Sequence, residues 1–315
     1  MTITTATEAE TTASPPTARG DRIFRGLSVG AGITILVALA AVFIFLAIEG
    51  IPGIDKPATN YRPLDSFLPY VGRLLFGTIF AALVALVIAV PFALGIALFI
   101  SHYAPKALAV PVAYVIDLLA AVPSVVFGLW GARVLGPYLV PAHSWLDRTL
   151  GFIPFFKGPG SVTGKTVLTA GTVLAIMILP IITAICREIF AQAPRLHEEA
   201  ALALGATRWE MVRLSVFPYA RSGMVSAVML GLGRALGETM AVAMVLSATP
   251  VVTLNMISNT NPATIASNIA SSFAEATPDK LAVLIATGLV LFVFTFAVNF
   301  AARAVVARSE RKFQR

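Results

Sequence analysis

Residues 194–218 read PRLHEEAALALGATRWEMVRLSVFP, and this stretch decides how the rest of the chain is interpreted. Pro194 suits the first turn of a helix, and the residues after it are strong helix formers. Gly205 can end that helix in a left-handed conformation. Thr207 and Glu210 have the T-x-x-E spacing of a capping box, which starts a second helix. The stretch is too polar to span a membrane, so we expect two short helices joined at Gly205.

This helical hairpin has two interpretations that the residues alone leave open. Glu198 and Glu199 lie in the first expected helix, and one or both can point at a partner protein. Alternatively, Val212, Leu214 and their apolar neighbours make an amphipathic hairpin that rests on the bilayer surface.

The chain around the hairpin has the composition of a membrane protein. Its 315 residues are 57% hydrophobic and only 12% charged, whereas about a quarter of the residues in a soluble domain are charged. Six apolar stretches reach the roughly 20 residues that a spanning helix needs. These stretches are 27–48, 74–100, 110–134, 167–187, 223–247 and 281–302. We therefore predict an all-α membrane protein whose transmembrane domain covers residues 23–307.

Lysine and arginine residues orient these spans. More of them fall in the inner segments when both termini are cytoplasmic, which favours that topology. The net charge of +7 then reflects cationic loops that face an anionic leaflet rather than nucleic acid. Residues 1–22 are expected to be disordered, and 308–315 form a basic cytoplasmic tail. The outer loop 135–165 contains four prolines and is expected to be irregular, and Asn261-Pro262 is expected to start a short surface helix.

Two charged residues fall inside the fifth expected span. Arg234 and Glu238 are four residues apart and share a helix face. A charge at the bilayer centre costs ~2.5–3.5 kcal/mol, so the pair must face a cavity or another helix. One interpretation is a structural ion pair. The other is an anion pathway, in which a guanidinium binds phosphate or sulfate oxygens and Glu238 keeps Arg234 from trapping the ion.

A third charge, Asp117, lies in the third expected span. Pro123 comes after it and removes a helix hydrogen bond, so Pro123 and Ser124 are expected to sit at a broken helix that offers backbone groups to a substrate or acts as a gate. Gly128 and Gly131 are expected to loosen the chain beyond this break. The alternative is that Asp117 merely caps or anchors the helix near the cytoplasmic interface.

The hairpin resembles the EAA loop of ABC importer permeases. That motif runs E-A-A, three residues, G, nine residues, I-x-L-P, and Ser215 and Phe217 stand here where Ile and Leu are usual. The resemblance implies a MetI-like type I permease fold in which the loop is a coupling helix, seated in a cleft of the nucleotide-binding subunit. It assigns ATPase coupling to six residues: Glu198, Glu199, Ala200, Ala201, Gly205 and Pro218.

The segments IDLLAAVPSVVFGLWG (116–131) and RSGMVSAVMLGLGRALGETMAVAMV (221–245) resemble the phosphate-specific branch of these permeases, and PstC-type subunits above all. Many relatives carry Glu where this chain has Asp117. The resemblance implies a non-catalytic subunit of a phosphate importer in the bacterial inner membrane. Its implied partners are a PstA-type permease, two PstB-type ATP-binding subunits and an extracytoplasmic PstS-type binding protein.

Three alternatives remain beside the phosphate permease. A permease for sulfate or molybdate would use the same residues. An ion-coupled secondary transporter would show an internal inverted repeat, which the sequence lacks. An intramembrane enzyme would need convergent catalytic groups in the spans, but the three histidines lie outside them.

One motif in the sequence imitates a nucleotide site. Residues 158–166 read GPGSVTGKT, close to the P-loop G-x-x-x-x-G-K-T, but Pro159 stands where the first glycine is required. Proline lacks the N–H that a phosphate cradle uses. We therefore expect this chain to bind no cofactor itself, with ATP and Mg²⁺ held by partner subunits.

Overall fold

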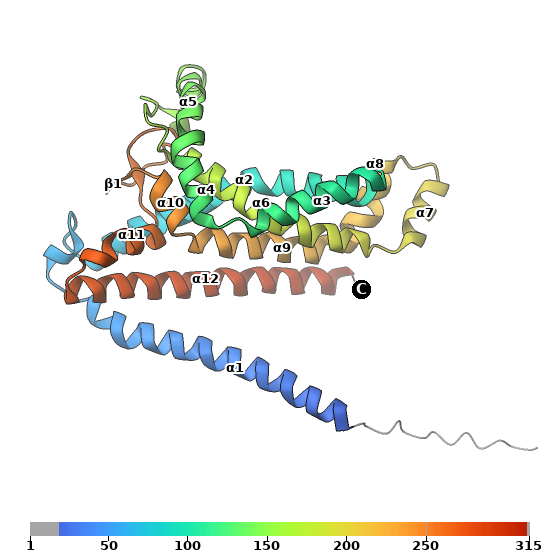
Figure 1. The fold of residues 1–315 in the computed structure, drawn as a ribbon, viewed down its shortest axis with the longest axis horizontal. Helices are drawn as coiled ribbons and strands as arrows, with labels where there is room; N and C mark the ends of the chain where they lie inside the picture. The colour runs from blue at the N-terminus through green and yellow to red at the C-terminus, as the bar shows by residue number, and fades with distance from the viewer. Residues whose placement is uncertain (1–18, 250, 314–315) are drawn as a thin grey trace, which may run out of the picture. The chain divides into compact units, whose positions relative to one another are not determined.

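A computed structural model of the chain describes residues 19–249 and 251–313, which are almost wholly helical (Figure 1). The longer α-helices are α1 Arg19–Gly50, α2 Phe67–Leu98, α3 Lys106–Ala121, α5 Gly136–Leu150, α6 Val167–Ala191, α9 Phe217–Gly237 and α12 Pro278–Phe313. The shorter ones are α4 Ser124–Trp130, α7 Arg195–Ala203, α8 Arg208–Met211, α10 Met240–Val245 and α11 Ile265–Ser272.

The connections contain three kinds of short element. The 3-10 helices are η1 Ile51–Gly53, η2 Ala58–Tyr61, η5 Pro154–Phe156 and η7 Phe273–Glu275. The π-helices are η3 Phe99–Tyr103, η4 Gly131–Leu135 and η6 Val212–Val216. The strands β1 Ala248–Thr249 and β2 Asn261–Pro262 pair in parallel.

The chain divides into two compact units, Met1–Phe45 and Leu46–Arg315. The first contributes most of α1, which begins at Arg19, so residues 19–22 of the segment expected to be disordered are helical. Residues 1–18 of that segment lie outside the described residues. The second unit holds every other element, and the candidate sites lie within it.

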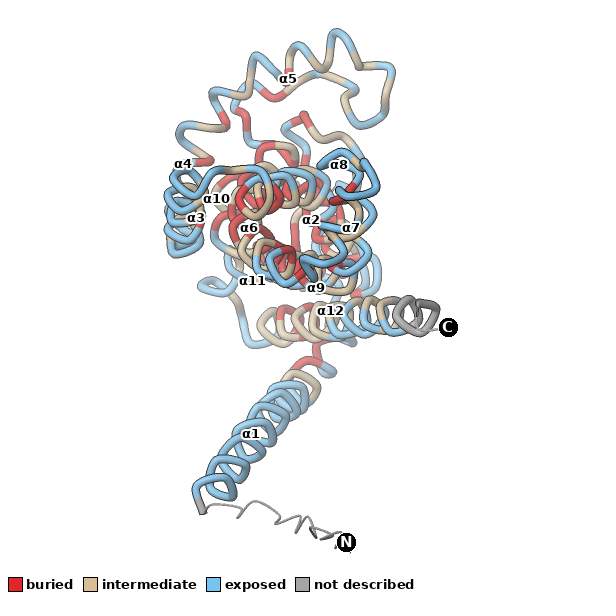
Figure 2. The backbone as a smooth tube through the Cα atoms, turned by 90° about the vertical axis from the view of Figure 1, so that its right-hand side faces the viewer, coloured by how far each residue is buried: buried red, intermediate tan, exposed pale blue. Residues whose placement is uncertain are grey.

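Helix α6 is the centre of the second unit and packs between α2 and α9 (Figure 2). Alanines at every fourth position give α2 a smooth face, and they are all almost completely buried: Ala81, Ala85, Ala89, Ala93 and Ala97. Small side chains at i, i+4 spacing let two membrane helices approach closely. Gly171 of α6 meets this part of α2, because a Cβ added there would lie 2.4 Å from a methyl carbon of Val84.

Among the described residues, five helices are long and apolar enough to cross a membrane. Four of them contain the expected spans 27–48, 74–100, 167–187 and 281–302. The fifth is Ser124–Leu150, which begins inside the third expected span and extends well past it. By length and composition, five of the described helices can therefore span a membrane, whereas six spans were expected.

The difference in number arises from two broken helices. The third expected span breaks at Val122-Pro123, where both residues have extended backbone. The fifth breaks at Glu238, which is also extended, and separates α9 from α10. The break at Pro123 leaves α3 with only 16 residues, and the break at Glu238 separates the apolar α10 from α9, so neither α3 nor α9 is counted as a spanning helix.

Two of the connections expected to lie outside also differ from expectation in their structure. Residues 136–150 of the loop expected to be irregular form α5, which continues from α4 through η4, and Pro137 follows directly after this π-helical turn. Asn261-Pro262 forms β2 instead of starting a helix. The short helix α11 begins three residues later, and Thr264 caps it by accepting a hydrogen bond from Ser267 N–H.

Candidate functional site

The hairpin 194–218 has the expected helix–glycine–helix form. Helix α7 begins directly after Pro194. Thr207 caps α8 in a complete capping box: its hydroxyl accepts from Glu210 N–H, and the Glu210 carboxylate accepts from Thr207 N–H at 2.8 Å. The Thr207 hydroxyl also donates to that carboxylate at 2.8 Å. These two hydrogen bonds, the backbone one first, lower the pKa of Glu210.

The turn between the two helices depends on Gly205. Its φ is +84°, in the left-handed region that favours glycine. The N–H of Gly205 donates to Leu202 O at 3.0 Å, and the N–H of Ala206 donates to Ala201 O at 3.1 Å. This pair of bonds is the Schellman motif, which satisfies the last carbonyls of a helix.

The second helix of the hairpin runs into α9 without a loop. Helix α8 continues through η6 directly into α9, and Pro218 is in the first turn of α9. Proline has no N–H to donate to Leu214 O, four residues earlier, and its ring crowds that carbonyl. A π-helical turn at 212–216 accommodates this defect. Any displacement of α8 is therefore transmitted along one continuous helical path.

The two adjacent glutamates of the motif have different surroundings. Glu199 is exposed. Glu198 faces the connection between α2 and α3, where its Oε1 lies 3.4 Å from His102 Nε2. The Ser101 hydroxyl lies 2.7 Å from the other ring nitrogen, Nδ1. Glu198 thus anchors α7 to η3, which leaves Glu199 as the carboxylate that can reach a partner.

A second contact explains one departure from the EAA motif. The hydroxyl of Ser215, in η6, donates to His197 O in the first turn of α7 at 3.0 Å. An isoleucine at this position could not make that bond. Neither His102 nor this role of Ser215 was predicted, because both contacts join residues that are distant along the chain.

The hairpin presents apolar surface as well as Glu199. Leu204 is 90% exposed at the turn, and Leu196, Trp209 and Leu214 are also exposed. A groove with a volume of about 800 Å³ lies between α7 and α8. Ala200, Ala201 and Gly205 contribute to its lining. An exposed apolar surface edged by charges is typical of a protein contact site.

The third expected span shows the predicted break and an ion pair. Helix α3 ends at Ala121, and α4 begins at Ser124. Asp117 Oδ2 lies 3.7 Å from Arg187 Nη2 on α6, and the Asp117 side chain is half exposed. The ion pair agrees with an anchoring role for Asp117, although the partner is a neighbouring helix rather than a cap.

Arg234 and Glu238 do not form the expected pair on one helix face. Helix α9 ends at Gly237, and Glu238 is its C-cap, after which the chain leaves the helix. Its carboxylate accepts from Ala241 N–H at 3.2 Å and caps the start of α10. Among the described residues, no ion pair joins the two. The i, i+4 argument failed because it assumed that the helix continues.

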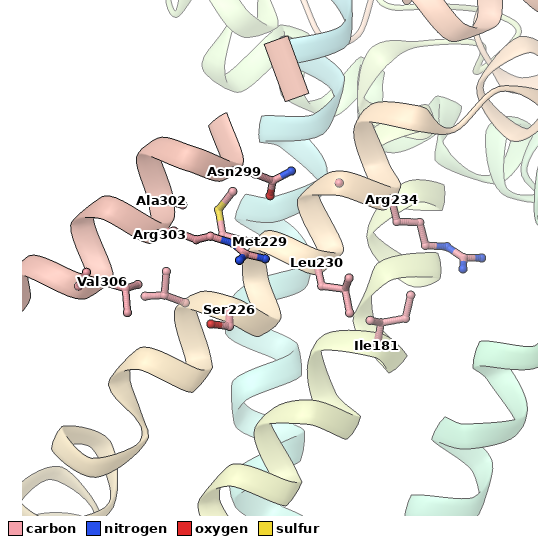
Figure 3. A pocket seen from close by; sticks show the side chains of 12 residues that line it. Ile181, Ser226, Met229, Leu230, Arg234, Asn299, Ala302, Arg303 and Val306 are labelled. Carbon is pink, nitrogen blue, oxygen red and sulfur yellow. The ribbon is translucent and has the colours of Figure 1, made fainter. Parts of the chain in front are cut away.

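Arg234 instead lines a groove between α6, α9 and α12, with a volume of about 840 Å³. Figure 3 shows Arg234 on α9 and Arg303 on α12 at different sides of this groove, with Asn299 also at its wall. The described residues that line it include two guanidinium groups and no carboxylate. The groove can therefore accept an anion.

Helices α4 and α10, which come after the two breaks, pack against each other. A Cβ added at Gly128 would lie 2.8 Å from Ala241 Cα, so the contact requires glycine. Gly131 likewise faces Val173 and Val245, whose methyl carbons would lie 2.6 and 2.9 Å from a Cβ added there. Gly128 and Gly131 thus fit close packing rather than the expected loosening.

Three glycines of α9 surround Arg234, and one of them lies at a helix contact. Gly231 faces Ile182 of α6, at 2.8 Å from an added Cβ, whereas Gly233 and Gly237 have nothing within 4 Å. Only Gly231 of the three is therefore needed for helix contact.

The segment that imitates a P-loop has a structural role. The Ser161 hydroxyl accepts from Gly164 N–H at 3.0 Å and from Thr163 N–H at 3.2 Å. Thr166 caps α6 by accepting from Thr169 N–H. The N–H groups of Thr163 and Gly164, which a P-loop would turn toward phosphate, are engaged within the chain.

A family model described as "Binding-protein-dependent transport system inner membrane component" matches residues 89–311, which include the hairpin 194–218 and both breaks. The chain belongs to this family. It is therefore a multi-pass inner membrane permease and a transport subunit rather than an enzyme. Membership implies a binding protein and an ATPase as partners.

Curated relatives extend the match to almost the whole permease. It is 47% identical to the phosphate transport system permease protein PstC 2 of Mycobacterium tuberculosis, over 92% of this chain and 93% of the relative. It is 42% identical to PstC of Mycobacterium leprae, over 92% and 94%, and 38% identical to PstC of Xylella fastidiosa, over 94% and 93%. The expected resemblance to PstC-type permeases is confirmed.

Two solved transporters share the fold of the permease. One is the methionine ABC transporter MetNI in an inward-facing conformation, with a TM-score of 0.52, 16% identity and coverage of 76% of this chain and 94% of that one. The other is a bacterial ABC transporter for the acidic polysaccharide alginate, with a TM-score of 0.53, 17% identity and coverage of 92% and 98%. The predicted MetI-like type I architecture is confirmed.

Proposed function

We propose that the permease is the membrane-spanning subunit of an ATP-driven importer for inorganic phosphate. The observation that carries this is the 47% identity to a phosphate transport permease over nearly the full length of both chains. The chemistry of the α6–α9–α12 groove supports it, because guanidinium groups bind phosphate oxygens in a bidentate manner.

The proposed assembly contains a PstA-type permease, two PstB-type ATP-binding subunits and an extracytoplasmic PstS-type binding protein. ATP and Mg²⁺ are bound by the PstB-type subunits. The hairpin 194–218 faces the cytoplasm, as do both termini. The exposed Glu199 and the exposed apolar residues around Gly205 support its role as the contact for an ATPase.

In the proposed mechanism, the loaded binding protein docks on the outer connections and two ATPases close on ATP. Their movement displaces α7 and α8, and the continuous path through η6 carries it into α9, on which Arg234 lies. The anchor between Glu198 and His102 carries the same movement to the end of α2. Phosphate then passes Arg234 at the interface of the two permeases.

The test is the ATPase activity of the purified four-component complex in proteoliposomes. Binding protein and phosphate together are expected to stimulate it, whereas binding protein with sulfate or molybdate is not. Stimulation by sulfate or molybdate in place of phosphate would transfer the function to another oxyanion. Phosphate uptake that proceeds without the ATPase subunits would contradict an ABC mechanism.

A further inference from the structure

A second pocket lies at the opposite end of the permease from the coupling hairpin and has a volume of about 370 Å³. It forms where η2 leads into α2, where α12 begins and where α11 lies beside them. Helix α2 has 32 residues, from Phe67 near this pocket to the π-helix beside α7. At about 1.5 Å per residue this places the pocket roughly 48 Å from the hairpin.

The lining of this second pocket, called the outer pocket below, is cationic and rich in hydrogen-bond donors. Its polar lining includes three basic side chains, Arg62, Arg73 and Lys280, together with Tyr70, Asn268 and Ser271. None of the described residues that line it is an aspartate or a glutamate. A concave site with three cations and no carboxylate favours a small multivalent anion.

Lys280 is held in place at the wall of the pocket. Its ammonium donates to Asn60 O at 2.7 Å and to the Tyr70 hydroxyl at 3.2 Å, and it lies 4.6 Å from the centre of the Tyr70 ring. An ammonium has three N–H donors, so one is left after these two bonds. A cation that is already ordered loses little side-chain entropy when it binds a ligand.

Tyr70 and Asn268 extend this fixed set of donors. The Tyr70 hydroxyl accepts from Lys280 and also from Asn268 Nδ2 at 2.9 Å, while its ring is almost fully buried. With its oxygen accepting twice, the phenol has its own proton left to donate, and Asn268 has a second N–H. These three ordered donors line the same pocket as the exposed Arg62.

We propose that this pocket binds inorganic phosphate as a waypoint at the outer face, before the ion reaches Arg234. The proposal rests on the proposed function, which places the hairpin in the cytoplasm and this pocket outside. Thr249 lines the pocket and lies shortly after α10, the short helix that Glu238 caps. The pocket is therefore joined through α10 to the break beside Arg234.

The chain offers a matched control for this site. Lys56 is another cation at the same end, but its ammonium is paired with Asp279 at 2.7 Å and it does not line the pocket. Lys56→Gln and Lys280→Gln remove the same charge. If this face attracts anions only through its total charge, both changes would weaken phosphate binding equally. If the pocket itself binds the ion, only Lys280→Gln would weaken it.

The experiment measures binding of radiolabelled phosphate to the purified complex of permeases and ATPases, without the binding protein. An Arg234→Gln background removes the groove of the proposed function. Phosphate is expected to bind this variant with a measurable Kd, which Lys280→Gln or Arg62→Gln raises at least tenfold and Lys56→Gln leaves unchanged. Lys280→Arg, which keeps the charge, and size-exclusion profiles of each complex exclude a folding defect.

Two results would overturn the outer site. One is phosphate binding that is the same with and without Lys280→Gln and Arg62→Gln. The other is unchanged phosphate binding with weaker docking of the empty binding protein, which would make the pocket a protein contact instead. Failure of the proposed function is distinguishable, because it appears in the unsubstituted complex as a loss of phosphate-stimulated ATPase activity.

Discussion

Gly205 is the residue at which the hairpin 194–218 reverses, and its substitution separates backbone strain from steric conflict. An added Cβ would meet nothing within 4 Å, so only the φ of +84° opposes a side chain. We expect Gly205→Val to abolish ATP-coupled uptake while the protein still inserts, because left-handed backbone costs a non-glycine residue about 1–2 kcal/mol and more for a β-branched one.

Asparagine tolerates the left-handed conformation, so Gly205→Asn should retain much of the uptake. The control is Gly95→Val on α2, where an added Cβ also has open space but the backbone is helical. Normal ATP-coupled uptake by Gly205→Val, measured in proteoliposomes, would show that coupling to ATP hydrolysis does not depend on this turn.

Glu238 offers a second test. A capping role and a charge role for its carboxylate predict different amounts of phosphate uptake in Glu238→Gln and Glu238→Ala. As the cap of α10 it needs only an acceptor for Ala241 N–H, which the glutamine amide oxygen supplies. We therefore expect Glu238→Gln to keep most of the phosphate uptake and Glu238→Ala to lose it. Equal losses in both variants would instead indicate that uptake depends on the negative charge beside Arg234.

The capping box of α8 makes one element of the hairpin sensitive to acid. Hydrogen bonds from Thr207 lower the pKa of Glu210, so the charged form is favoured when α8 is folded. The stabilisation is complete above the unfolded pKa of Glu210 and is lost as the pH falls through the lower folded pKa. We expect α8 to loosen only in acid below the ordinary range of a glutamate.

Trp209 lies in α8 against Phe217, with ring centres 6.0 Å apart, and can report this change. In a background with Trp130→Phe and Trp145→Phe, the fluorescence anisotropy of Trp209 should fall in that acidic window. Thr207→Ala should lower it at neutral pH as well, since losing a cap costs about 1 kcal/mol. An acid transition of the same size in Glu210→Gln would assign the effect to another group.

At the scale of elements, the features that could be predicted from sequence are those with local causes. Gly205, the Thr207 cap and the break at Pro123 each arise from the conformational limits of a residue and its near neighbours. The break at Glu238 has no proline to mark it, so the pattern there is that of one continuous helix. The outer pocket was not predictable, because Arg62 and Lys280 meet only through the packing of η2 against α12.

Across the second unit, the two broken helices meet at one contact, between α4 and α10. The break at Pro123 precedes α4, the break at Glu238 precedes α10, and these two short helices pack together. We expect movement that enters α9 from the hairpin to displace α10 and, through it, α4.

Gly128→Leu tests this arrangement, because a side chain there would press on the Ala241 backbone, 2.8 Å from even a Cβ. Overpacking costs typically about 1–3 kcal/mol. Met244 Sδ, 3.1 Å from the added Cβ, can move aside, but the Ala241 backbone cannot. We expect the thermal unfolding temperature of the complex to fall and phosphate uptake to be lost. ATPase activity should no longer respond to the loaded binding protein. Gly95→Leu, in open space on α2, should change none of these measurements. Retained stimulation of ATPase activity in Gly128→Leu would show that the hairpin reaches the outer side without this contact.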